Sequence, residues 1–176
     1  TNAALAEASG DYVTLMDHDD FIEPDALYET VRAVQNGADI VYTDEDKYDT
    51  ASGRYLSPYR KSGYNRELLL SNNYICHMFT VRKDIADSTG GFDSSFDGAQ
   101  DYDFILKCIE KTQPSKISHV HEMLYHWRIH AGSTSGNPES KLYAYEAGKR
   151  VLEAYLERNE LSGHVSDTPH RGFYRI

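Results

Sequence analysis

Short apolar runs alternate with segments of helical spacing along the first part of the chain. Residues 12–16 are apolar, β-branched or aromatic, which is typical of a short buried strand. Residues 24–37 predict a helix, because apolar side chains recur every three or four positions and Gly37 suits the end of a helix. Residues 38–43 form a second apolar run. This alternation predicts an α/β fold with a mostly parallel central sheet flanked by helices.

The later part of the chain continues the pattern with more turn-forming residues. The predicted elements are a loop or ragged hairpin at 48–64, a strand at 74–82, a turn-rich loop at 83–100, a helix at 101–112, a strand ending in a small-residue loop at 116–135, and a long amphipathic helix at 138–161. We expect a single domain over residues 1–176.

Composition narrows the class of protein. The 176 residues carry a net charge of −10, the wrong sign for binding nucleic acid over a broad face. Cys76 and Cys108 lie far apart, each in an apolar run, so we expect reduced core cysteines and a cytoplasmic protein. The first residues resemble a helix already under way. We therefore expect a domain that lacks its N-terminal part.

An acidic cluster ends the first predicted strand. Asp17, Asp19 and Asp20 would repel one another without a counter-ion, so we expect a positive group beside them. Oxygen ligands of this kind suit Mg²⁺ or Mn²⁺, and one or two carboxylates suffice where phosphates complete the coordination. A calcium EF-hand is excluded, because Phe21 and Ile22 stand where that loop needs a ligand and a glycine. The alternative is a solvated turn that caps the next helix.

A second acidic pair opens the helix predicted at 101–112. Asp101 and Asp103 follow a loop with paired glycines, and an aspartate in a pocket can act as general base toward a hydroxyl. A carboxylate at this position is also typical of simple N-capping. The residue pattern alone leaves both interpretations open.

The segment "HWRIHAGSTS" forms a third group. Arg128 offers a planar fork for phosphate oxygens, His130 suits a metal ion or a proton, and Ser133 can hydrogen-bond an anion. The alternative is an exposed strand edge with polar side chains.

These groups occur in an order that resembles a known family. The chain carries "DHDD", "VYTDEDKYD", "LLLSNNYICHMFTVRKD", "GGFDSSFDGAQDYDF" and "EMLYHWRIHAGSTS". This series is similar to the inverting glycosyltransferases of family 2 with the GT-A fold, in the subgroup of bacterial O-antigen and rhamnose-rich polysaccharide assembly. The resemblance covers nearly the whole chain and implies a partial GT-A-like fold, truncated at the N-terminus.

The resemblance also implies roles for single residues. Asp101 matches the catalytic base, with Gln100 in place of the family's glutamate. The positions that match donor binding are Asp17, Arg128 and Ser133. The positions that match metal binding are Asp19 and His130. The donor is expected to be a UDP- or dTDP-sugar and the cofactor Mn²⁺ or Mg²⁺. The "DED" of residues 44–46 belongs to the same subgroup pattern, and a structural turn is its default interpretation.

The expected function is therefore metal-dependent, inverting sugar transfer from a nucleotide-diphosphate donor to a glycan or lipid-linked glycan hydroxyl, in cell-surface polysaccharide synthesis. A non-catalytic carbohydrate-binding or scaffold remnant of the fold is the main alternative. A metal-dependent phosphohydrolase ranks last, because the sequence offers no second ligand set. A homodimer would cover the truncated edge, and a position at the inner face of the plasma membrane would meet lipid-linked acceptors.

Overall fold

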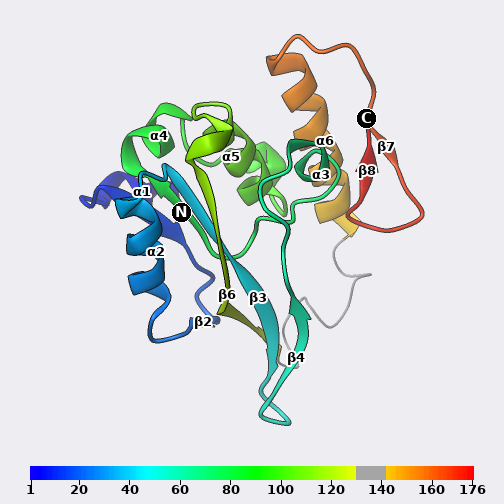
Figure 1. Cartoon of the computed structure of the whole chain (residues 1–176). Helices are drawn as coiled ribbons and strands as arrows, with labels where there is room; N and C mark the ends of the chain where they lie inside the picture. The colour runs from blue at the N-terminus through cyan, green and yellow to red at the C-terminus, as the bar shows by residue number, and fades with distance from the viewer. Residues whose placement is uncertain (130–141) are drawn as a thin grey trace.

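The computed structural model describes residues 1–129 and 142–176, which form an α/β fold (Figure 1). The helices are α1 (Asn2–Glu7), α2 (Ala26–Gln35), α3 (Arg66–Leu69), α4 (Lys83–Ser88), α5 (Gln100–Ile109) and α6 (Leu142–Arg158), with 3-10 turns η1 (Ser94–Phe96) and η2 (Pro114–Lys116). The strands are β1 (Tyr12–Leu15), β2 (Phe21–Ile22), β3 (Ile40–Asp49), β4 (Arg54–Tyr59), β5 (Phe79–Arg82), β6 (Ile117–Ile129), β7 (Ser166–Asp167) and β8 (Tyr174–Arg175).

The central sheet has the order β1-β5-β3-β6-β2, with β4 also paired to β3. Among the pairs that the structure describes in this sheet, β3–β6 is parallel and the others are antiparallel. The prediction of a mostly parallel sheet is therefore wrong, while the α/β class is confirmed. β4 turns back along the second half of β3 as a hairpin. β5 runs in the same direction as β4 and pairs with the start of β3. A parallel neighbour on this side would need a crossover to the other end of the sheet.

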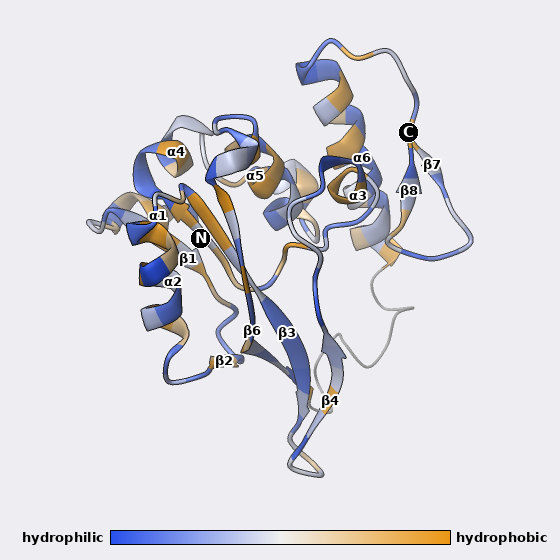
Figure 2. Ribbon diagram, viewed as in Figure 1, coloured by the Kyte–Doolittle hydropathy of each residue, from blue (hydrophilic) through white to orange (hydrophobic). Residues whose placement is uncertain are grey.

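Strand β3 divides the core between its two faces. Successive side chains of a strand point to opposite sides, so Val41 packs with Ala33 of α2 on one face. Ile40 and Tyr42 join the larger cluster on the other face, where α4, α5 and α6 contribute their apolar side chains. Figure 2 shows that β3 changes from hydrophobic among the helices to hydrophilic toward the β3–β4 hairpin. The polar half of β3 is where the candidate site begins.

Three predicted elements differ in extent from the observed ones. The hairpin expected at 48–64 is present, but the strand expected at 74–82 is reduced to β5, and α4 occupies part of the loop expected at 83–100. The backbone of residues 75 and 77 bonds side chains instead of a neighbouring strand, which explains the late start of β5. The helix expected at 138–161 is observed as α6 from Leu142 to Arg158, and residues 159–161 lie beyond its end.

Helix α2 is confirmed, but it faces the sheet with small residues. Leu27 and Val31 are 58% and 50% exposed, whereas Ala26, Thr30 and Ala33 are buried. The Thr30 hydroxyl donates to the carbonyl of Ala26, so its burial leaves that group satisfied. None of the helices in the described ranges has the length and apolar character to cross a membrane.

Candidate active site

The acidic turn after β1 points two carboxylates outward and one inward. The side chains of Asp17 and Asp19 are 62% and 35% exposed, whereas Asp20 is buried. Asp20 accepts the Arg128 amide N–H at 2.8 Å on Oδ1 and the Tyr125 hydroxyl on Oδ2. It anchors the turn to β6 and does not cap α2. The outward pair faces the solvent from which a ligand would arrive.

Arg128 supplies a positive group beside this turn. Strand β2 follows the turn directly and pairs antiparallel with β6, which brings Arg128 alongside. Its Nε donates to the carbonyl oxygen of Asp19, and its guanidinium carbon lies 5.1 Å from the Phe21 ring centroid. Burial raises the pKa of Asp20, although the Tyr125 and Arg128 hydrogen bonds act in the lowering direction. A fixed cation at this point reduces the repulsion among the aspartates.

Asp101 lies in the first turn of α5, and its side chain does not cap the helix. Ala99 is the N-cap residue, without a side-chain cap bond. The Asn73 amide instead donates to Asp101 Oδ2 at 3.1 Å. The partly buried Cys76 is a neighbour: burial, followed by the nearby Asp101, raises the pKa of its thiol. The structure thus gives Asp101 the surroundings of a positioned carboxylate instead of a helix cap.

His77 lies between Asp17 of the acidic turn and Glu45, and sequence reasoning missed it. Its Nε2 lies 3.7 Å from Asp17 Oδ2 and its Nδ1 lies 3.5 Å from Glu45 Oε2. Its ring stacks on Tyr125, with centroids 4.9 Å apart and planes at 12°. Burial acts to lower the pKa of His77, but Glu45 and then Asp17 and Asp101 outweigh it and raise the pKa. A histidine inside an apolar run was the available signal.

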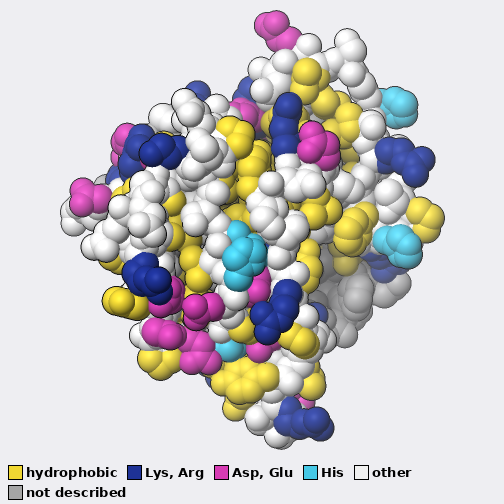
Figure 3. All heavy atoms as spheres, in the orientation of Figure 1, with side chains coloured by type: hydrophobic (Ala, Val, Ile, Leu, Met, Phe, Trp, Pro, Cys, Tyr) yellow, Lys and Arg dark blue, Asp and Glu magenta, His cyan; other side chains and the backbone are white. Residues whose placement is uncertain are grey.

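The "DED" of residues 44–46 lies within β3 and bonds one histidine at each position. Its contacts are Asp44 Oδ1 with His119 Nε2 at 2.7 Å, Glu45 with the backbone N–H of His77, and Asp46 Oδ1 with His126 Nδ1 at 2.6 Å. The default expectation of a simple structural turn is therefore wrong, because these residues form part of a strand that pairs with both β4 and β6. Figure 3 shows acidic side chains gathered on one face, with histidine and basic side chains beside them.

The donor set at the turn suits a cation that phosphates help to hold. No group of three or more potential ligands comes together within residues 1–129 and 142–176. Mg²⁺ in nucleotide sites, however, takes only one or two carboxylates and fills the remaining positions with water and phosphate oxygens. Asp17 and Asp19, on one turn and facing solvent, fit that arrangement. The expected ligands His130 and Ser133 lie outside the described residues.

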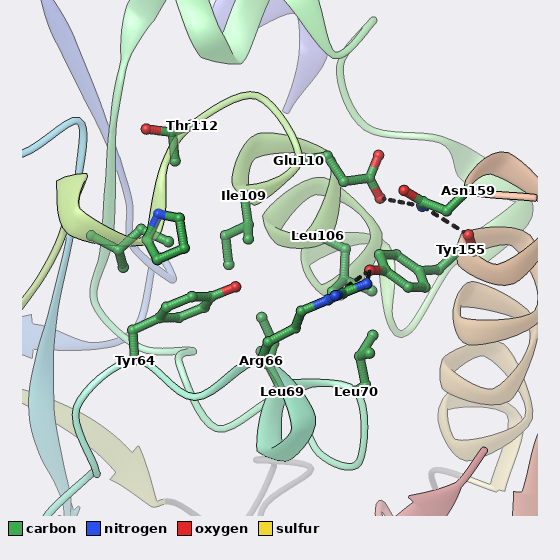
Figure 4. Close-up of a pocket in the computed structure, with 12 residues that line it drawn as sticks. Tyr64, Arg66, Leu69, Leu70, Leu106, Ile109, Glu110, Thr112, Tyr155 and Asn159 are labelled. Atoms are coloured by element: carbon green, nitrogen blue, oxygen red, sulfur yellow. Dashed lines mark hydrogen bonds between the residues drawn. The ribbon is translucent and has the colours of Figure 1, made fainter. Parts of the chain in front are cut away.

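A cavity of about 250 Å³ lies elsewhere, between α3, α5 and α6 (Figure 4). Leu69, Leu106 and Ile117 contribute to its apolar lining. Ile117 pairs with Ile40 at the start of β3, so the cavity borders the opposite end of the sheet from the acidic half of that strand. Arg66 points into it and donates to the Tyr155 hydroxyl at 2.8 Å. The residues that line it include none of the candidate site residues.

Comparison with known proteins identifies the family. Residues 1–90 match Glycosyl transferase family 2, and the chain belongs to this family. It is 41% identical over 160 residues to "Uncharacterized protein y4gI" of Sinorhizobium fredii, covering 90% of this chain and 18% of the relative. It is 34% identical over 168 residues to "O-antigen biosynthesis protein RfbC" of Myxococcus xanthus, covering 94% and 13%. The chain thus spans less than a fifth of these relatives.

A solved structure shows the same fold. The crystal structure of S. aureus TarS 1-349 in complex with UDP-GlcNAc has a TM-score of 0.63, with 18% sequence identity, over 88% of this chain and 45% of that chain. The expected GT-A-like fold is confirmed by this likeness. At this identity the comparison concerns the fold alone.

Proposed function

We propose that the protein transfers a sugar from a nucleoside-diphosphate donor to a hydroxyl of a glycan or lipid-linked glycan, with inversion, in cell-surface polysaccharide synthesis. The observation that carries the proposal is that one segment contacts both acidic groups: His77 Nε2 lies 3.7 Å from Asp17 Oδ2 of the acidic turn, and the Asn73 amide donates to Asp101 Oδ2 at 3.1 Å. The likeness to TarS, crystallised in complex with UDP-GlcNAc, supports this donor class, and the likeness to the O-antigen biosynthesis protein RfbC supports this process.

Asp101 is the proposed general base. Its carboxylate takes the proton of the acceptor hydroxyl while that oxygen forms a bond to the anomeric carbon. The bond from that carbon to the diphosphate oxygen breaks on the opposite face, so the configuration inverts and the diphosphate leaves with the electron pair. The Asn73 amide holds Asp101 Oδ2 at 3.1 Å, which fixes the carboxylate before the acceptor arrives.

Arg128 and the acidic turn form the proposed donor side. The guanidinium of Arg128 is held against Asp19 and Phe21, where it would stabilise charge on the departing diphosphate. Asp17 and Asp19 would hold Mg²⁺ or Mn²⁺, which when bound neutralises diphosphate charge. The proposal also includes His130 as a further ligand of the metal ion and Ser133 as a contact to the donor phosphate.

Two expectations about the whole protein also stay proposals. Among the described strands, β1 is at an edge of the sheet, and unpaired edges favour pairing with another chain. A homodimer through this edge would double the mass in light scattering, and a monomeric mass at micromolar concentration would contradict it. Work at the inner face of the plasma membrane is the setting in which a lipid-linked acceptor would be met.

The test of the proposed function is turnover by the full-length protein. We expect release of nucleoside diphosphate from a UDP- or dTDP-sugar to depend on a glycan acceptor, and Asp101→Asn to reduce kcat by about 10²- to 10⁴-fold. Nucleotide affinity, measured by calorimetry, should remain near that of the wild type. Glycan binding without turnover would overturn the proposal in favour of a carbohydrate-binding protein, and acceptor-independent phosphate release would favour a phosphohydrolase.

A further inference from the structure

Among the residues that the structure describes, Lys61 is the buried lysine. Its side chain has 0% exposure. The ammonium donates to the carbonyl of Ile75 at 3.0 Å, to the carbonyl of His77, and to Glu45 Oε2 at 3.0 Å. An ammonium group has three donors, and here each has an acceptor. Burial lowers the pKa of Lys61, while Glu45 acts in the opposite direction.

Glu45 completes this contact from β3. Its Oε2 accepts both the Lys61 ammonium and the backbone N–H of His77. Burial acts to raise the pKa of Glu45, but His77 and Lys61 outweigh it and lower the pKa. Together the two side chains bind three backbone groups of residues 75 and 77. Within the part of the chain that the structure describes, this segment precedes β5 and pairs with no strand.

The opposite side of the same segment faces Asp101. Residues 73–77, which we call the Asp101 loop, carry Asn73, whose amide bonds Asp101, and Cys76, whose thiol lies beside it. The loop also carries His77, which lies between Glu45 and Asp17. The side chain of Ile75 is fully buried in the core. The backbone of the loop is therefore bound by the Lys61–Glu45 ion pair, while its Asn73 side chain contacts Asp101.

We infer that the buried Lys61–Glu45 pair is a positioning element for Asp101, acting through the Asp101 loop. This inference rests on the proposed function, in which Asp101 is the base. A buried ion pair stabilises a fold little compared with apolar residues of the same size, so stability alone does not explain it. Displacement of a catalytic group by about 1 Å costs on the order of 10²-fold in rate. This inference gives Glu45, the central residue of the "DED", a role in positioning Asp101.

The test compares three replacements of Glu45 in the full-length protein. One carboxylate oxygen takes both hydrogen bonds, so Glu45→Gln keeps an acceptor where it is needed and should retain most of kcat. Glu45→Ala removes the acceptor and should lower kcat by about 10²-fold, with the donor KM changed by less than about threefold. Glu45→Asp keeps the charge on a shorter side chain and should fall between them, which covers the case in which the alanine variant does not fold.

Alkylation of Cys76 gives a readout independent of turnover. In a Cys108→Ala background, iodoacetamide should react slowly with Cys76, because this thiol is partly buried and its pKa is raised. The reaction should be at least about tenfold faster in Glu45→Ala, because local opening exposes the loop. Glu45→Gln should remain slow. Arg82→Met is the matched control: it breaks the Arg82–Asp39 pair, 2.6 Å long, at the far end of β5, and should change stability without changing the alkylation rate or kcat.

The outcomes separate the inference from the proposed function. If the wild type transfers sugar and Asp101→Asn does not, a Glu45→Ala variant with unchanged kcat overturns the inference alone. If the wild type fails to transfer any sugar, the proposed function falls, and equal alkylation rates in Glu45→Ala and the wild type would show that the loop does not depend on the pair.

Discussion

Two acidic runs in this protein look alike in sequence and have different fates in the structure. Each follows apolar residues typical of a strand: residues 17–20 after β1 and residues 44–46 in β3. The side chains of the second run are only 1%, 12% and 10% exposed. In the first run, Asp17 and Asp19 are 62% and 35% exposed. One run is built into the protein and the other is presented to solvent.

The difference arises from the neighbours of each strand. β3 lies between β6 on one side and β4 and β5 on the other, so its acidic half continues as a paired strand and its carboxylates must find partners within the fold. β1 has four residues and lies at an edge of the sheet that the described residues form, and the chain leaves the sheet before its aspartates. Carboxylates that follow a strand are therefore open to solvent where the strand has ended, and need partners within the fold where it continues.

The largest effect that this comparison predicts is on stability, at Asp44. Its side chain accepts the Lys61 amide N–H at 2.9 Å and contacts His119 at 2.7 Å. Asp44→Ala leaves those buried partners unsatisfied, so we expect the free energy of unfolding to fall by about 3 kcal/mol. Urea denaturation measures it. The same replacement in the exposed run, Asp17→Ala, should change stability by less than about 0.5 kcal/mol; equal losses at both positions would remove the distinction.

The next effect is on ligand binding, at Asp19. With Mn²⁺ present, Asp19→Ala should weaken UDP binding by at least about tenfold, because a carboxylate ligand of the cation is lost. Calorimetry with and without Mn²⁺ measures this. His18→Ala is the matched control, since that side chain is 98% exposed on the same turn. If Mn²⁺ makes no difference to the wild type, or if both variants weaken binding equally, Asp19 is not a cation ligand.

The sequence predicted the positions of the helices and strands better than it predicted which strands pair and in which direction. Local spacing identified α2, α5, the hairpin and most strands, because periodicity depends on neighbouring residues. It did not predict the antiparallel β5, since strand direction depends on how distant segments return to the sheet. The apolar run at 74–78 satisfied a strand pattern, yet Lys61 and Glu45 bind its backbone.

The same limit applies to the site. Asp17, Asp19, Asp101 and Arg128 were identified through the order of the motifs. The structure places Arg128 at Asp19 and His77 at Asp17. Whether Asp101 caps its helix could not be decided locally, because the competing partner, Asn73, lies 28 residues away. The roles themselves remain predictions for the experiments above.

The smallest effect concerns the pH dependence of stability at Glu45, the middle residue of the buried run. Its pKa is lowered from the ordinary 4.5, so its contribution to the free energy of unfolding is complete above pH 4.5 and is lost as the pH falls through the lowered value. Glu45→Gln cannot titrate. The wild-type advantage over this variant should therefore be largest near neutral pH and shrink in acid, as urea titrations at several pH values would measure.

Glu157→Gln makes the same replacement at an exposed position of α6 and serves as the control for the chemistry of the substitution. A Glu45→Gln difference that stays constant between neutral and acid pH would mean that the glutamine is less stable because of packing and not because of charge. That result would separate two parts of the comparison: Glu45 would still belong to the buried run, but its ionisation would not contribute to the free energy of unfolding. A difference that shrinks on acidification assigns the effect to the carboxylate that Lys61 and His77 share.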